Sequence, residues 1–202
     1  MKLLRLSLIV ALASYCVLSS VGPAASTTVE RMNVERLTQH GSTIIVGTVT
    51  GLSDGVGSNG LPYTEVSVSI SQTIQGTAAG TYTFRQFGLL APRDDGNGRT
   101  NLLVSPEGWP TFAVGEEVML FLFETTALGF QSTVGLFQGK FNLQNGSMIN
   151  AIDNRGLFTG MTVDPGLLTD AETEMLATER GAVPAHTFVS FVTKAVQNSW
   201  FE

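Results

Sequence analysis

Alternating apolar and polar positions dominate the middle of the chain. In the segment 63–74 (YTEVSVSISQTI), Val66, Val68, Ile70 and Ile74 fall on one face, and most of the Ser and Thr residues fall on the other. A period of two over this length predicts a strand with one buried face. The neighbouring segments TIIVGTVT and TYTFRQF are rich in β-branched and aromatic residues and predict strands at 43–50 and 81–87.

A second type of strand is predicted where consecutive residues, and not only alternate ones, are apolar. The segment 118–123 (VMLFLF) is typical of a central strand covered on both faces. The segments 130–136 and 137–143 are expected to continue the sheet. Asn145-Gly146 then predicts a type I′ hairpin turn, and DNRG at 153–156 predicts another turn. These short, consecutive strands favour a mainly β fold, namely an antiparallel OB-like barrel or sandwich with its core over about residues 41–160.

The periodicity becomes helical towards the end of the chain. TDAE at 169–172 fits a capping box and predicts a helix to about Arg180, closed by Gly181. A second helix is predicted from Pro184, so that two C-terminal helices cover about residues 169–198. Its apolar stripe is expected to dock on the β core rather than on a membrane and consists of Phe188, Phe191, Val192 and Ala195. A short helix is expected before the first strand, at about 33–40.

The first residues have the pattern of a signal peptide. Lys2 and Arg5 precede an apolar stretch at 6–18 (LSLIVALASYCVL), which is shorter than the ~20 residues that span a bilayer. Small residues follow, and cleavage after Ser26 would place two of them at the positions that a signal peptidase requires. We therefore expect residues 1–26 to be a signal peptide, although an uncleaved anchor is the alternative, and residues 27–202 to form one β-rich domain that is secreted or periplasmic.

Composition narrows the possible chemistry of the mature chain. Cys16, the single cysteine, lies in the expected signal peptide, so thiolate metal sites, disulfides and cysteine nucleophiles are not expected. The formal net charge of −6 becomes more negative when Lys2 and Arg5 are removed. An acidic chain without a basic run is a poor partner for nucleic acid and for anionic membranes. We expect no cofactor, and no contact with a membrane after cleavage.

One polar loop resembles a calcium-binding loop. The segment 93–101 (RDDGNGRTN) contains two aspartates, two glycines and two asparagines between apolar runs. Counted as an EF-hand from Asp95, Arg99 falls where an oxygen ligand is needed and Pro106 where a bidentate Glu is needed. Counted from Asp94, glycines occupy ligand positions. We therefore interpret the segment as a turn and expect no metal site, while calcium binding by this loop stays open.

A second motif points to hydrolysis. GLSDG at 51–55 matches G-x-S-x-G, and His186 follows later in the chain, so Ser53 and His186 are the candidates for a small secreted serine hydrolase. The motif requires a helix directly after the serine, but the glycine-rich GVGSNGLP follows, so a hairpin loop is the preferred interpretation.

The remaining charged candidates do not form a catalytic pair. Glu116 and Glu117 are adjacent at a strand start and should point to opposite faces, and Lys140 is expected on the rim of the sheet.

The order TIIVGTVTGL, YTEVSVSISQTIQG, FAVGEEVMLFLF and VGLFQGKFNL resembles a group of exported bacterial β-barrel proteins without an assigned activity. The resemblance covers roughly residues 37–143. It implies an OB-type core, similar in layout to netrin-like domains and to tissue inhibitors of metalloproteinases. Those inhibitors reach zinc through an N-terminal cysteine, which the mature chain lacks, so the resemblance implies a layout and transfers no site residue.

These observations favour a non-catalytic, exported binding or accessory module. Its partner would be an extracellular or envelope protein, or a glycan. OB-type barrels bind along one open face and its bordering loops, which here would be 52–62 and 89–110. The second loop and its flanks supply a candidate binding set of aromatic and guanidinium side chains, namely Arg93, Arg99, Trp109 and Phe112. The alternative for the aromatic residues is that they close one end of the barrel.

Overall fold

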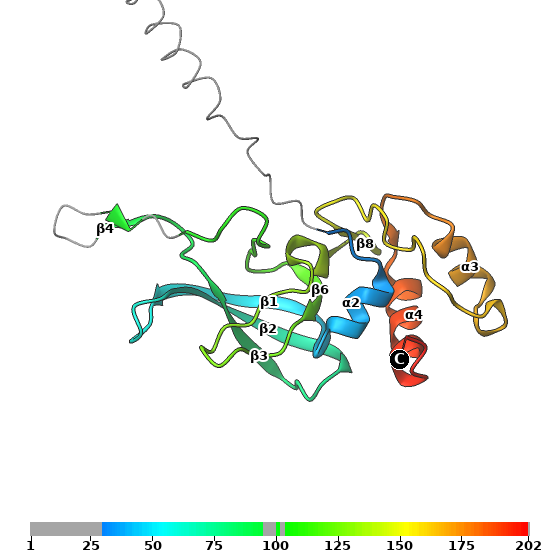
Figure 1. Cartoon of the computed structure of the whole chain (residues 1–202), viewed down its shortest axis with the longest axis horizontal. Helices are drawn as coiled ribbons and strands as arrows, with labels where there is room; N and C mark the ends of the chain where they lie inside the picture. Colours follow the sequence, from blue (N-terminus) through cyan, green and yellow to red (C-terminus); the bar gives the residue numbers. More distant parts are fainter. Residues whose placement is uncertain (1–29, 95–99, 102–103, 202) are drawn as a thin grey trace, which may run out of the picture. The chain divides into compact units, whose positions relative to one another are not determined.

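The computed structural model describes residues 30–94, 100, 101 and 104–201. The chain divides into two compact units, 1–30 and 31–202, and the fold described here is that of the second unit. It is mainly β, as the sequence predicts. Its centre is a seven-stranded antiparallel sheet in the order β3-β2-β1-β6-β7-β8-β9 (Figure 1). The predicted signal peptide, residues 1–26, lies entirely outside the described residues.

The first three strands form a meander with a long hairpin. β1 (Thr43–Val56) pairs with β2 (Pro62–Gln75), and β2 pairs with β3 (Thr81–Phe87). All three predicted strands are confirmed, but β1 runs on through GLSDG, where the sequence predicted a loop from residue 52. The extension is held by the partner strand, because residues 51–56 pair continuously with residues 67–62 of β2 and the turn begins only at Gly57.

Three register shifts interrupt the β1–β2 ladder, and they correct one sequence prediction. Ile44 lies opposite Gln75 and Ile45 lies opposite Thr73, so Ile74 is an extra residue at a β-bulge. Past the bulge, the residues of β2 that had faced one side of the sheet are followed by residues of the same alternation that face the other side. Val66 and Val68 therefore pack in one core, whereas Ile74 packs against the other, although strict alternation placed all three on one face.

The strand β6 (Glu117–Leu122) lies at the centre of the sheet, between β1 and β7. Its residues 118–122 are fully buried. Val118, Leu120 and Leu122 face one core, and Met119 and Phe121 face the other. The apolar run without alternation therefore marks a strand covered on both faces, as predicted.

The sheet continues through β7 (Lys140–Gln144) and β8 (Ser147–Asn150), joined at Asn145-Gly146. Both turn residues have positive φ, 51° and 76°, as a type I′ turn requires. The strand predicted at 130–136 is wrong. That segment makes one isolated bridge to β6 and then enters the 3-10 helix η1 (Leu136–Gly139), because Gly135 adopts a left-handed conformation that ends extended pairing.

Helices pack on one face of the sheet. α2 (Val34–His40) begins at Asn33, whose side chain accepts from the Arg36 backbone amide, and Gly41 ends it as predicted. The short η2 (Pro165–Leu167) precedes α3 (Asp170–Leu176), and β9 (Val183–Pro184) leads into α4 (Ala185–Gln197). α4 contacts α2, α3 and β8 (Figure 1). The two predicted C-terminal helices are thus present, and the predicted stripe of α4 is buried against the sheet.

The capping box of α3 is confirmed, but its predicted end is not. The helix stops at Leu176 with Ala177 as its cap, rather than at Arg180. Gly181 does have a positive φ of 99°, yet its amide donates to the Asp153 carbonyl at 2.8 Å instead of closing a helix. Gly181 was predicted to end the helix, but it instead forms a hydrogen bond with a residue that is distant in the sequence.

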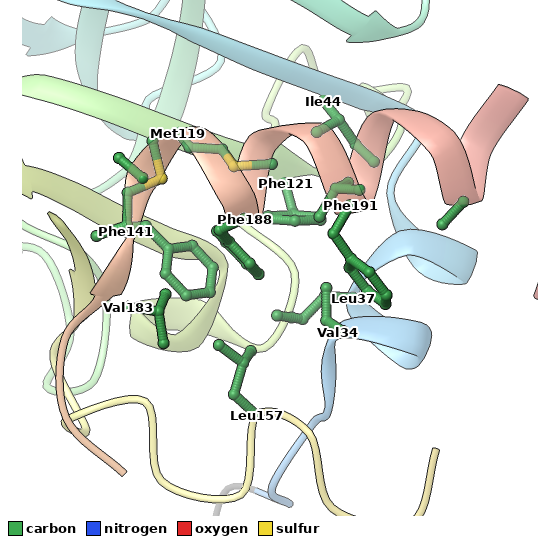
Figure 2. Packing of buried hydrophobic residues seen from close by; sticks show 14 of the residues in the cluster. Val34, Leu37, Ile44, Met119, Phe121, Phe141, Leu157, Val183, Phe188 and Phe191 are labelled. Atoms are coloured by element: carbon green, nitrogen blue, oxygen red, sulfur yellow. The ribbon is translucent and has the colours of Figure 1, made fainter. Parts of the chain in front are cut away.

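Two cores lie on opposite faces of the sheet. The helix-side core gathers α2, α4, β6, β7 and β8 around aromatic rings in tilted contact. Figure 2 shows Phe141 and Phe188 together there, and their ring centroids are 5.0 Å apart. The second core consists of the coiled β1, β2, β3 and β6, with Phe112 packed against it. Among the described residues no ladder joins β3 to β9, so the sheet is not closed into a barrel.

Candidate functional site

The loop between β3 and β6 folds back over the end of the β1–β2 hairpin and encloses a hollow of about 440 Å³. Gly88 makes the approach possible, since a Cβ at this position would lie 2.4 Å from the Ser105 Cα, and its φ is 104°. Leu89 then bridges to Val104. We call this space the loop hollow; its lining residues are Thr64, Gln86, Leu89, Leu90, Val104, Ser105, Thr111 and Phe112.

Buried polar side chains fix the walls of the loop hollow. The Thr64 hydroxyl donates to the Gly88 carbonyl at 2.8 Å, and the Gln86 amide donates to the Pro110 carbonyl at 3.2 Å. Both side chains belong to buried residues, and both satisfy backbone carbonyls of the loop. The hydrogen bonds hold the loop at a fixed height over the sheet, because a buried donor without its acceptor would be costly.

A buried lysine anchors the loop from the other side. Lys140 Nζ donates to the Thr111 carbonyl at 2.6 Å and to Glu116 Oε2 at 2.7 Å, and it lies 4.8 Å from the ring centroid of Phe112. Its side chain is only 8% exposed. The prediction that Lys140 lies on the rim is therefore wrong, because the loop that covers it comes from 24 residues earlier in the chain.

The mouth of the loop hollow is apolar. Leu90 is 52% exposed and Val104 is 37% exposed, although both line the hollow. Asp54 of β1 ties the mouth to the hairpin, since its carboxylate accepts from the Leu90 amide and from the Arg93 guanidinium. Val56, also exposed, follows Asp54 by two residues on the same face of the strand.

The four predicted binding residues have different surroundings. Arg93 lies beside the mouth, but it is paired with Asp54. Phe112 lines the loop hollow and packs edge-on against Phe84, with ring centroids 5.7 Å apart, so it both closes a core and forms a wall. Trp109 is half-buried and is not among the lining residues. Arg99 lies outside the described residues.

The polar loop at 93–101 is only partly described. Arg93–Asp94 forms β4 and pairs antiparallel with β5, Thr100–Asn101. These flanks are those of a hairpin, which agrees with interpretation of the segment as a turn. Residues 95–99 lie outside the described part, so the calcium hypothesis is untested there. Across the described residues, no group of three or more His, Cys, Asp or Glu side chains is placed to hold a metal ion.

The hydrolase candidates lie far apart. Ser53 is an exposed residue of β1 opposite Glu65, within a strand rather than at a strand-to-helix turn. His186 is exposed on α4 and shares a hollow with Val46 of β1. Seven residues of strand separate Val46 from Ser53, roughly 23 Å at 3.3 Å per residue. The described geometry does not bring a base to this serine.

Sequence reasoning missed the charged contacts that hold these segments together. Glu172, Lys140 and Asp54 each carry such a contact, and each partner comes from another element. Charged side chains are almost never buried without a partner, so a prediction that one of these residues is buried would have implied an ion pair. The sequence pattern did not predict that burial. One buried acceptor, Asn142 Oδ1 on β7, has no hydrogen-bond partner within the described part of the chain.

Comparison with known proteins gives no relative for this chain. It matches no protein-family model, no curated protein and no solved structure. Within the described residues, none of the helices combines the length and the hydrophobicity that crossing a bilayer demands. The geometry of the site itself is therefore the basis on which a function can be assigned.

Proposed function

We propose that this protein is an exported, non-catalytic binding module that holds a segment of an extracellular or envelope protein at the loop hollow. The observation that carries the proposal is the combination of rigid walls with an exposed aliphatic mouth. Thr64 and Gln86 fix the walls, and Leu90 and Val104 remain half-exposed around the opening. A pre-formed concave site with apolar lining and few polar groups is typical of ligand binding.

The chemistry of the mouth favours a protein over a glycan. Exposed aliphatic side chains that cluster mark contact with other apolar surface, and Leu90, Val104 and Val56 gather at this end of the molecule. Sugars are commonly held by stacking on exposed aromatic faces, whereas the one aromatic wall, Phe112, is engaged by Phe84 and Lys140. A protein segment with an aliphatic side chain is the better match.

Two further parts belong to this proposal. The coiled β1–β2–β3 meander, with β6 on the other side of β1, supports an OB-type layout of the kind that the sequence resemblance implies. Export, to the periplasm or beyond, rests on the signal-peptide pattern of residues 1–26. The acidic composition supports a protein partner rather than nucleic acid or a membrane surface.

No observation favours the second candidate, a serine hydrolase. Its nucleophile Ser53 and its base His186 would have to meet, and they lie on separate parts of β1 and α4. Labelling of the folded chain with a fluorophosphonate, lost in Ser53→Ala, would nevertheless establish that activity and overturn the non-catalytic part of the proposal.

Site-specific photo-crosslinking in the native host tests the proposed site. We expect benzoylphenylalanine at position 90 to yield a discrete crosslinked product with another protein, identifiable by mass spectrometry. The same photoreactive residue at position 128, where a leucine in a different loop is even more exposed (65%), should yield none. Absence of a product at position 90, or the same products at both positions, would overturn the loop hollow as the binding site.

A further inference from the structure

A separate groove runs between α4 and the sheet. It encloses about 370 Å³. Val46 of β1 and Leu143 of β7 form its floor, and Val189 of α4 forms its wall; all three are partly exposed and pack on the helix-side core. Gln72 closes one side through a hydrogen bond to the Thr193 hydroxyl at 3.2 Å. We call this the helix groove.

The helix groove borders a second hollow with an acidic wall. This hollow, of about 380 Å³, shares Leu143 with the groove and is also lined by Thr48 and Glu117. In the sheet register Val46 lies opposite Met119 and Thr48 lies opposite Glu117. Residues two apart share a face of a strand and are about 7 Å apart. Glu117 therefore lies one side-chain spacing beyond the apolar floor, on the same face.

Glu117 is the carboxylate that a ligand could use. Its neighbour Glu116 also lines the second hollow, but its Oε2 accepts from Lys140 Nζ at 2.7 Å and from the Ala113 amide at 3.1 Å. The exposed Glu117 side chain has no hydrogen-bond or ion-pair partner anywhere in the described residues. Glu117 is thus the carboxylate at this end of the groove that the fold leaves unpaired. The groove's own lining also includes Lys194, which is paired with Glu172, and the exposed His186.

We propose that the helix groove binds an extended segment of a partner protein that carries an aliphatic side chain and, two residues further on, Lys or Arg. The aliphatic side chain would lie on Val46 and Leu143 and against Val189. The same-face spacing of an extended peptide, about 7 Å, is close to the roughly 7–8 Å expected between the diagonal cross-strand neighbours Val46 and Glu117. Charge complementarity then selects a basic residue at the second position.

The helix groove and the loop hollow use different residues, so the two proposals fail or succeed separately. The helix groove shares no lining residue with the loop hollow. A crosslink at position 90 says nothing about Glu117, and a peptide bound at Glu117 leaves the loop hollow untested. A partner protein with two contact segments could use both.

Peptide titrations test this inference directly. The probes are the peptides Ser-Ser-Leu-Ser-Lys-Ser-Ser and Ser-Ser-Leu-Ser-Glu-Ser-Ser, titrated into the ¹⁵N-labelled full chain at low salt and followed by NMR. We expect the lysine peptide to bind the wild type and to shift amide signals of Val46, Leu143 and Val189. Glu117→Lys should weaken this peptide about five- to tenfold and strengthen the glutamate peptide, because an exposed attraction becomes a repulsion.

Matched variants separate a local contact from net charge. Glu124→Lys changes an exposed acid elsewhere by the same charge and should leave both affinities unchanged. Glu117→Gln should fall between wild type and Glu117→Lys. Equal affinities for the two peptides, shifts outside the groove, or no binding at millimolar peptide would overturn the inference. So would a wild-type dimer in sedimentation that Glu117→Lys dissociates, since the occupant would then be a second copy of this chain.

Discussion

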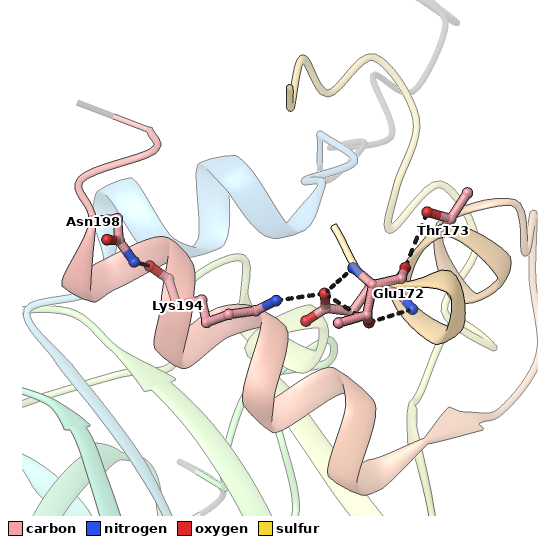
Figure 3. Close-up of polar contacts among 5 residues, drawn as sticks. Glu172, Thr173, Lys194 and Asn198 are labelled. Atoms are coloured by element: carbon pink, nitrogen blue, oxygen red, sulfur yellow. Dashed lines mark hydrogen bonds and ion pairs between the residues drawn. The ribbon is translucent and has the colours of Figure 1, made fainter. Parts of the chain in front are cut away.

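At the scale of single residues, the fold tolerates buried charge only where partners surround it. Glu172 is 2% exposed, and its Oε2 accepts from Lys194 Nζ at 2.5 Å as well as from the Thr169 amide and hydroxyl (Figure 3). Lys140 is held in the same way by a carboxylate, a carbonyl and a ring. Burial of such groups without these bonds would cost several kcal/mol.

The surroundings of Glu172 act on its pKa in opposite directions. Burial, the largest influence, raises the pKa of the carboxyl, but the hydrogen bonds from Lys194 and Thr169 together outweigh it, so the pKa is lower than the ordinary value of 4.5. A carboxyl with a lowered folded-state pKa stabilises the fold above its unfolded pKa. This stabilisation is lost as the pH falls through the lowered folded-state value.

Replacement of Glu172 should therefore lower the stability of the fold at neutral pH and have little effect on stability in acid. We expect Glu172→Gln to lower the free energy of unfolding by about 1–3 kcal/mol at pH 7, because the cap and the Lys194 pair both weaken. The difference from wild type should shrink below about pH 4, as urea denaturation at pH 7 and pH 3 would measure. Glu174→Gln, an exposed neighbour on α3, is the control, and an equal loss in both variants would contradict the argument.

At the scale of elements, the bulges of the β1–β2 hairpin set the curvature of the sheet. Three register shifts lie between Ile44 and Gly51, and each bulge increases the local twist. At one of them the strands approach closely: a Cβ on Gly47 would lie 2.3 Å from the Ser69 carbonyl oxygen. Gly47 is therefore required by the approach of two backbones rather than by a turn.

Alanine at Gly47 should be poorly tolerated. The added methyl must displace the backbone of β2, so we expect Gly47→Ala to cost about 1–3 kcal/mol and to lower the Tm by about 3–10 °C. Gly51→Ala is the matched control on the same strand, since its Cβ would lie 3.6 Å from the nearest atom, in ordinary contact. Calorimetry would compare the two, and a Gly47 variant as stable as the Gly51 variant would rule out the close approach.

At the scale of the whole domain, the strands β1 and β6 join the two cores, and β1 sends Ile44 into the helix-side core and Ile45 into the other. β6 sends Met119 and Phe121 into the helix-side core and Leu120 into the other. Neither core can lose these strands without exposing the apolar side chains of the other. The domain should accordingly unfold as one cooperative unit.

The two tryptophans allow a test of this cooperativity. Trp200 stacks edge-on with Phe191 of the helix-side core, at 5.7 Å between ring centroids, and Trp109 precedes Phe112 of the second core. Trp109→Phe and Trp200→Phe each leave one reporter. We expect each variant's fluorescence transition in urea to coincide with its own circular dichroism transition. A Trp109 signal that changes before the loss of secondary structure would show that the loop around Trp109 unfolds separately.

Patterns within one element were enough to find most of the fold. The strands at 43–50, 63–74 and 81–87, the doubly buried strand and the Asn145-Gly146 turn are local signals, and all are confirmed. The errors arise where tertiary contacts override local preference. Ile74 changes face at a bulge, and Gly181 gives its amide to Asp153.

The candidate sites were predicted less well, since they depend on contacts between distant segments. The sequence directed attention to the 89–110 loop, and Phe112 does line a hollow there. It could not show that Asp54 accepts from Arg93 across 39 residues, nor that Lys140 is buried beneath the loop. The helix groove was not predicted at all, because its floor and wall come from three elements.

The sequence by itself determined most of the extended and helical segments and most of the apolar faces, because side-chain period and turn chemistry act over a few residues. Tertiary structure alone decided that the sheet stays open, which charges are buried in pairs, and where apolar side chains are left exposed around a hollow. Those outcomes depend on contacts between segments that are distant in the sequence. Buried side chains, ion pairs and hollows form only when these segments pack together.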